Sequence, residues 1–400
     1  MTLETATLAG GDIEVTFLQQ AGRDPFTTTP ERTAQMTEVA GRIARLIGEA
    51  RATLDIAIYD FRLRDDAATI VAEALRSQAR KGVVIRIAYD HAPDPGGDGI
   101  PAASPGHLEA DKKPPGTDSF VRSFADVAQI KGITGYRVLM HNKYIIRDAD
   151  SVEAAVFTGS SNYTNDSWGL QENNLLCLRS RQLASYYTRD FNDLWSRGAI
   201  LDSTGSRDMG TVRVNDVPVT IAFTPGESPA VVKEIVGAIT AARRRLYVAS
   251  VVLSSGPILA ALSEGIDRGL PLAGLYDGPQ MDQVERQWKA AHVGADKVNT
   301  WEKVASRLVR KNSIPYDRNQ PNQPHNFMHN KLVIADDNVV TGSFNLSNHA
   351  MGNAENVLLI RDQELASPQI RGIHPTFDDN LFDAANGKTM TRVSIEHTNE

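Results

Sequence analysis

The sequence predicts an α/β protein made of two similar lobes, each a mostly parallel sheet flanked by helices. The main observation is a repeat, because residues 140–148 (MHNKYIIRD) return at 328–336 as MHNKLVIAD with six of nine positions identical. Helix-like and strand-like segments also alternate in the same order before each copy. The two motif histidines are 188 residues apart (329 − 141), which indicates that a whole lobe was duplicated.

The first half of the chain predicts a β-α-β unit followed by the first copy of the repeat. Apolar residues at helical spacing predict helices at about 31–50 and 66–80, and alternating apolar residues predict strands at 54–59 and 83–89. The order is therefore helix, strand, helix, strand. This order is typical of parallel pairing. Residues 91–135, rich in Pro, Gly and Asp, are predicted to be a long irregular insertion. Strands are then expected at 143–147, 154–159 and about 173–179, and a helix at about 181–197; no element is predicted within residues 1–30.

The second half repeats this plan after a linker predicted at 202–218. The expected elements are a helix around 232–239, a strand at 246–253, a helix around 258–266 and a strand at 272–276. Tyr276-Asp277 ends the last strand as Tyr89-Asp90 ended its counterpart. A second long polar insertion is predicted at 278–327. The expected domains are therefore 1–201 and 219–400.

Bulk properties limit the classes of function. The 400 residues carry a net charge of −7, so the global field does not favour nucleic acid, although a local basic groove would still bind it. Cys177, the single cysteine, excludes an internal disulfide framework. No segment has the run of about 20 apolar residues that spans a bilayer, and Met1–Asp12 does not resemble a secretory signal. These features favour a cytoplasmic location and leave a secreted mature form open.

The repeated residues suit an anionic substrate. In His141-Asn142-Lys143 the histidine and lysine point to one face of a strand, since side chains alternate there. The imidazole can act as nucleophile or general acid, and the ammonium suits a phosphate oxygen. His329 and Lys331 repeat the pair. Two half-sites brought together would thus form one active site.

Residues after each copy complete the half-sites. Polar turns supply hydroxyl and amide groups for phosphate binding, and carboxylates further on are candidates for orienting the histidines. The candidate phosphate-binding residues are Lys143, Lys331, Asn162, Asn345, Ser160 and Ser343, and the candidate histidine-orienting residues are Glu172 and Glu355. Such a cluster can perform displacement at phosphorus, with one histidine attacking and the other protonating the leaving oxygen. This chemistry requires no metal or other cofactor, and the sequence shows no persuasive cluster of metal ligands.

This doubled pattern resembles the phospholipase D superfamily, in which each half carries His-x-Lys-(x)4-Asp followed by Gly-Ser-x-Asn. Both copies match through Asp148 and Asp336, and the second part matches at 159–162 and 342–345. The resemblance implies a two-lobed α/β fold with the site between the lobes and a covalent phosphohistidine intermediate. It also implies that the two aspartates are structural, and it favours His141 as nucleophile and His329 as acid.

Three functions remain open at this stage. A phospholipase D-type enzyme that hydrolyses a phosphatidyl diester, or transfers it to an alcohol, is favoured. A metal-independent nuclease of the same superfamily is the alternative, but no long basic stripe with interleaved aromatic residues is present. A binding module without catalysis is disfavoured by the intact histidines in both halves. Because one chain carries both half-sites, we expect a monomer.

Overall fold

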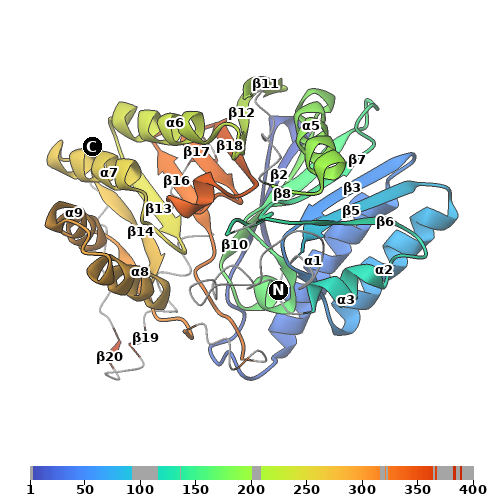
Figure 1. Cartoon of the computed structure of the whole chain (residues 1–400), viewed down its shortest axis with the longest axis horizontal. Coiled ribbons are helices and arrows are strands. Elements are labelled where there is room, and N and C mark those ends of the chain that lie inside the picture. Colours follow the sequence, from blue (N-terminus) through green and yellow to red (C-terminus); the bar gives the residue numbers. More distant parts are fainter. Residues whose placement is uncertain are drawn as a thin grey trace, which may run out of the picture.

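The computed structural model describes residues 3–91, 116–135, 137–200, 209–315, 320, 323–363 and 365–366, together with short strands at 382–383 and 388–389. Two lobes lie side by side, the first (blue to green) on the right of Figure 1 and the second (yellow to red) on the left. Each contains an eight-stranded sheet, and the strand order is the same in both. The α/β class and the duplication are therefore confirmed.

The first lobe contains the predicted helices and strands and several further elements. Its strands are β1 (Glu4–Leu8), β2 (Ile13–Leu18), β3 (Thr53–Ile58), β4 (Phe61–Arg62), β5 (Val84–Asp90), β6 (Gln129–Ile133), β7 (Lys143–Arg147), β8 (Ala155–Gly159), β9 (Tyr163–Thr164) and β10 (Asn173–Arg179). Its helices are α1 (Pro30–Gly48), α2 (Asp65–Arg80), α3 (Thr117–Arg122), α4 (Asn165–Gly169) and α5 (Arg181–Arg197).

The second lobe repeats the arrangement. Its elements are β11 (Gly210–Val214), β12 (Val217–Thr224), α6 (Ser228–Ala241), β13 (Leu246–Ser250), α7 (Gly256–Asp267), β14 (Leu272–Asp277), α8 (Gly278–Ala290), α9 (Ala295–Ala305), β15 (Val309–Lys311), β16 (Lys331–Ala335), β17 (Asn338–Gly342) and β18 (Glu355–Arg361). The strands β19 (Phe382–Asp383) and β20 (Lys388–Thr389) form a separate pair.

The sheets are mixed and not mostly parallel as expected. The first runs β1-β2-β10-β8-β7-β3-β5-β6, and only the pairs β3–β5 and β5–β6 are parallel. The pairs from β1 to β3 along this order are antiparallel. The β-α-β order thus predicted the parallel pair β3–β5 correctly, whereas β6 lies in a segment that was expected to be irregular. The strands that carry the repeat are joined by short turns, which can connect only antiparallel neighbours.

Three segments expected to be irregular contain regular structure. The predicted linker 202–218 includes β11 and the start of β12. The predicted insertion 278–327 contains α8, α9 and β15, because Asp277 Oδ1 accepts the Gln280 N–H and caps α8 while Met281, Trp288 and Trp301 give its helices buried apolar faces. Within the insertion 91–135, α3 and β6 form; residues 92–115 lie outside the described part of the chain.

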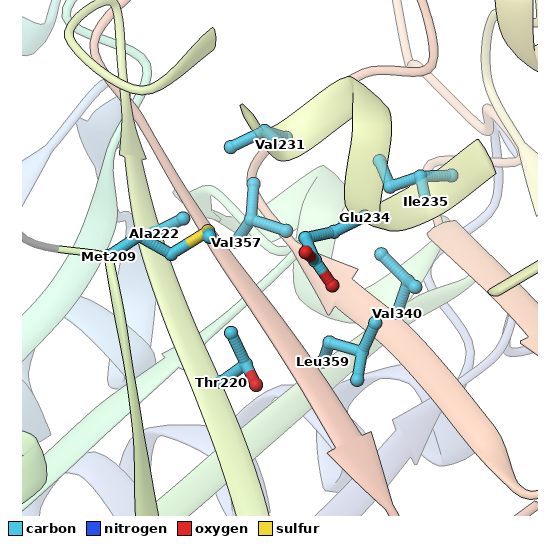
Figure 2. Close-up of a pocket in the computed structure, with 9 residues that line it drawn as sticks. All are labelled: Met209, Thr220, Ala222, Val231, Glu234, Ile235, Val340, Val357 and Leu359. Atoms are coloured by element: carbon cyan, nitrogen blue, oxygen red, sulfur yellow. The ribbon is translucent and has the colours of Figure 1, made fainter. Parts of the chain in front are cut away.

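Three apolar cores stabilise the two lobes. One packs α1 and α2 on the outer face of the first sheet, and a second packs α6, α7 and α9 on the outer face of the second. The third combines α5 with inner-face residues of both sheets, so the two lobes share it. A small hollow on the outer face of the second sheet, shown in Figure 2, lies beside α6 and is lined by Glu234 and mostly apolar side chains, none of them from the repeated motif.

Candidate active site

Each copy of the repeat forms a backbone bridge with the opposite lobe, just before one of its strands. The backbone N–H of His141 donates to the carbonyl of Ala354 at 2.8 Å, and that of His329 donates to the carbonyl of Glu172 at 3.0 Å. Both contacts immediately precede a strand of the partner lobe, β18 or β10. The two half-sites are therefore held against each other at the lobe interface.

The histidine and lysine of each copy share one face, as the alternation predicted. His141 and Lys143 are buried, and Lys143 Nζ donates to the His141 carbonyl at 2.7 Å. His329 and Lys331 are buried in the same way, with Lys331 Nζ donating to the His329 carbonyl at 2.7 Å. Since an ammonium has three donor hydrogens, each lysine keeps donors for a bound anion.

Burial dominates the electrostatics of these four groups. It lowers the pKa of Lys143 to about 7, and the carboxylates Glu355, Asp60 and Asp90 oppose that shift. Burial and then the ammonium of Lys143 lower the pKa of Lys331 well below its ordinary value. The pKa of each histidine is also well below its ordinary value, because of burial first and then the two lysines. A bound anion would reverse these shifts, so the site favours anionic ligands.

The motif aspartates support the backbone of each lobe. Asp148, at φ 49°, accepts the N–H groups of Arg51, Ala52 and Thr53 at 2.7–2.9 Å. Asp336, at φ 53°, accepts those of 243–245 at 2.7–3.0 Å. In each lobe the carboxylate ties the end of the motif strand to the segment entering the neighbouring strand, β3 or β13.

The serines lie behind the histidines rather than facing a substrate. Ser160 is fully buried; its hydroxyl donates to Asn173 Oδ1 at 2.8 Å and accepts the Asn174 N–H. The Ser343 hydroxyl, equally buried, accepts the Asn356 N–H at 2.9 Å. These contacts differ from the expected direct contact of both hydroxyls with phosphate.

The two turn asparagines remain candidates for binding the anion, because the Nδ2 of each amide can donate to it. The Oδ1 atoms of Asn162 and Asn345 are buried and accept no hydrogen bond from the described residues. Both side chains follow the glycine that ends a central strand, at φ 140° for Gly159 and 132° for Gly342. A Cβ at either glycine would lie 2.2 Å from the carbonyl oxygen of the adjacent strand, so this turn requires glycine.

The histidine-orienting residues differ between the half-sites. Glu355 Oε2 lies 2.7 Å from His141 Nδ1 and comes from the opposite lobe, in accord with the expected contact. Glu172, expected to be its counterpart, instead pairs with Lys311 at 2.5 Å. The residue against His329 is Asn173, whose Oδ1 lies 3.0 Å from Nδ1.

A shift of one residue in the repeat explains this difference. The Ser160 N–H donates to the Asn174 carbonyl, and the Ser343 N–H donates to the Asn356 carbonyl, so Asn174 and Asn356 are structural equivalents. Asn173 is therefore equivalent to Glu355. Glu172 and Glu355 are each followed by an asparagine, and matching these two Glu-Asn pairs makes Glu172 the counterpart of Glu355. Alignment of the apolar strands that follow instead makes Asn173 the counterpart.

Other residues that contact the site belong to no motif in the sequence. The Tyr59 ring lies edge-on to His141, with centroids 4.8 Å apart, and Lys143 Nζ is 5.2 Å from its centroid. Asp90 and Asp277 accept the backbone N–H groups just before the histidines, at 2.8 and 2.9 Å. The paired Tyr-Asp strand ends had marked these two aspartates as equivalent without indicating their contact.

Within the described residues, no helix is long and apolar enough to cross a membrane. The same part of the chain contains no group of three or more His, Cys, Asp or Glu side chains placed to hold a metal ion.

One comparison with known proteins identifies the family of this chain. A family model described as "Cardiolipin synthase, PLD-like domain" matches residues 43–195 and 235–372, most of both lobes. A comparison with curated protein sequences returns no match.

Two solved structures share the fold. Phosphatidylserine synthase from Haemophilus influenzae Rd KW20 superposes with a TM-score of 0.57 at 14% identity, covering 92% of this chain and 88% of that chain. Polyphosphate kinase from Porphyromonas gingivalis gives 0.51 at 8% identity, covering 90% of this chain and 48% of that chain. Nuc from Salmonella typhimurium, a phospholipase D family member, gives 0.28 at 22% identity over 38% of this chain and 88% of that chain.

Proposed function

Because the chain belongs to the phospholipase D-like family whose model is described as "Cardiolipin synthase, PLD-like domain", we propose that it cleaves or exchanges a phosphatidyl-type phosphodiester through a covalent phosphohistidine. The proposal rests on one observation, which is that the two half-sites lie together at the lobe interface and are buried. His141 and Lys143 come from one lobe, and His329 and Lys331 from the other.

The first step forms the intermediate. His141 Nε2 attacks phosphorus, the bond from phosphorus to the leaving alcohol breaks, and the alcohol oxygen takes a proton from His329 Nε2. Glu355 at His141 Nδ1 offsets the positive charge that develops on the attacking ring. Lys143, Lys331 and the amides of Asn162 and Asn345 stabilise the non-bridging oxygens.

The second step releases the phosphoryl group. Water or an alcohol gives its proton to His329 Nε2 as its oxygen attacks phosphorus, and the N–P bond electrons return to His141. Two in-line displacements retain configuration at phosphorus. The chemistry is the same for hydrolysis and transfer, so the acceptor decides the product.

The substrate preference is for a phosphatidyl diester, supported by the lipid enzyme in the family description. A labelled phosphatidyl lipid in mixed micelles and a labelled single-stranded DNA should be tested side by side. We expect turnover of the lipid, and His141→Ala and His329→Ala should each reduce it by about 10²–10⁴-fold or more. The control is His349→Ala, which removes an exposed histidine.

The outcomes separate chemistry from substrate. If the protein cleaves DNA and not the lipid, and both histidine variants lose that cleavage, the mechanism stands and the protein is a nuclease. Substantial activity in either alanine variant would contradict the shared site. A base quench should trap the phosphoryl group as a phosphoramidate, and inversion at phosphorus would exclude the covalent step.

A further inference from the structure

The two half-sites differ in the group behind each catalytic histidine. His141 Nδ1 faces a carboxylate oxygen of Glu355 at 2.7 Å, and His329 Nδ1 faces an amide oxygen of Asn173 at 3.0 Å. The two positions are equivalent in the duplicated fold, because Asn174 and Asn356, one residue further on, receive the same serine contacts. The lobes therefore supply different chemistry to otherwise matching imidazoles.

The orientation of the Asn173 amide is determined by its surroundings. Its Nδ2 donates to the Ser167 carbonyl at 3.1 Å, and a carbonyl can only accept. The opposite atom, Oδ1, accepts the Ser160 hydroxyl at 2.8 Å and faces His329. Asn173, Ser160 and Ser167 are all fully buried. Because Oδ1 cannot donate, Nδ1 of His329 must carry hydrogen, which leaves Nε2 for the reaction.

Among the residues that the structure describes, no carboxylate acts on His329 in place of the amide. Glu172, next to Asn173 in the sequence, is buried and paired with Lys311, also buried. The groups that act on His329 through its charge are Lys331 on its own strand, and Lys143 and His141 from the first lobe. All three can carry positive charge, so they disfavour the imidazolium.

We propose that Asn173 is a positioning residue that makes the two histidines inequivalent, presenting His329 as the acid–base group and leaving His141, backed by the Glu355 carboxylate, as the nucleophile. The inference rests on the proposed function for the meaning of these two roles. A neutral amide holds the ring in place without stabilising its charge, so the His329 imidazolium gives up its proton readily to a leaving oxygen. A carboxylate stabilises the cationic ring that forms when His141 binds phosphorus.

The first test needs no turnover. The full chain, labelled with ¹⁵N-histidine, is titrated by NMR, and the His329 and His141 signals are assigned by their loss in His329→Ala and His141→Ala. We expect neutral His329 to carry its proton on Nδ1 in the wild-type protein. A wild-type His329 protonated on Nε2 would overturn the proposal, and this measurement does not depend on any variant at position 173.

The second test replaces the amide by an isosteric carboxylate. Asn173→Asp should raise the pKa of His329 by about one unit or more, a tenfold gain in proton affinity, because it adds a negative charge beside Nδ1. The His141 signals and the circular dichroism spectrum serve as controls for folding. An unchanged His329 pKa in a folded Asn173→Asp protein would contradict the role of Asn173.

The third measurement links the position to catalysis. In Asn173→Asp, the limb of the pH–rate profile that reports the acid should move to higher pH by the same amount as the His329 pKa. A uniform fall in rate with no movement of the profile would show a merely structural role. If the NMR expectations hold but no phosphodiester is turned over, the proposed function fails while the inequivalence of the two rings stands.

Discussion

At the scale of single residues, the site is a buried group of basic side chains with little compensating charge. Lys143, Lys331, His141 and His329 are buried together, and Glu355 is the carboxylate that contacts this group directly. Burial raises the pKa of Glu355 to about 8 and lowers that of Lys143 to about 7, while each opposes the shift of the other. Burial thus weakens both charges, and under the proposed function a phosphate group would supply the anion that the lysines lack.

This balance predicts a pH dependence for anion binding. Because burial lowers the pKa of Lys143 to about 7, its ammonium is present below that pH and is lost above it. We expect sulfate, whose charge is constant over this range, to bind most tightly below pH 7 and progressively more weakly as the pH rises through 7. Lys143→Met should weaken binding at pH 6 by about 10–100-fold and reduce the pH dependence.

Isothermal titration calorimetry at several pH values measures both effects. Lys297, on α9 and outside the motif, gives the control variant Lys297→Met, which should bind sulfate as the wild-type protein does. Sulfate affinity that is independent of pH in the wild-type protein, or unchanged in Lys143→Met, would contradict the assignment of Lys143 to anion binding.

At the scale of elements, the strand β15 adds a cation that its counterpart lacks. Lys311 pairs in register with Asp277, and the equivalent residue in the first lobe, opposite Asp90 on β6, is Ile133. Lys311 crosses the interface to Glu172, and neither group is exposed. Here a buried ion pair stands where the first lobe has an apolar residue. Each charge of such a pair depends on the other, because a buried charge without its partner is costly.

Breaking this pair should therefore be costly. Lys311→Met leaves the Glu172 carboxylate buried and unpaired, and we expect a loss of about 3–5 kcal/mol in the free energy of unfolding, measured by denaturant titration. The double variant Lys311→Met/Glu172→Gln should recover most of it. The neighbouring pair Arg310–Asp282 is 39% and 41% exposed, so Arg310→Met should cost about 1 kcal/mol or less. Equal losses for Lys311→Met and Arg310→Met would contradict the argument.

The sequence predicted some of the helices and strands and missed others. Periodicity placed α1, α2, α5 and the strands that carry the repeat, because each has a strong apolar pattern and a clear end. It missed β1 and β2, whose polar alternate residues Thr5 and Thr16 pair across the strands, and it missed the antiparallel pairs, which depend on contacts between distant segments. The motif residues were identifiable because they occur twice, whereas Asn173 and Lys311 were missed because they differ between the copies.

At the scale of the whole molecule, the lobes form one unit. Besides the shared core, two equivalent hydrogen bonds cross between them: Thr341 donates to Asn174 at 2.9 Å, and Asn356 donates to Thr158 at 2.9 Å. The orienting groups cross as well, since Glu355 belongs to the lobe opposite His141, and Asn173 to the lobe opposite His329. A lobe on its own would have a histidine without its partner.

Because the complete site lies within one chain, two inactive variants should not rescue each other. Purified His141→Ala and His329→Ala proteins, mixed under mild denaturing conditions and refolded together, should give no more activity than the sum of the two alone. If the lobes exchanged between chains, one combined site in a mixed dimer would contain both wild-type histidines, and activity would return. Light scattering before and after mixing provides the mass of the refolded species. Recovery of activity with a dimeric mass would show that partner chains complete each other's sites, and the expectation of a monomer would be wrong.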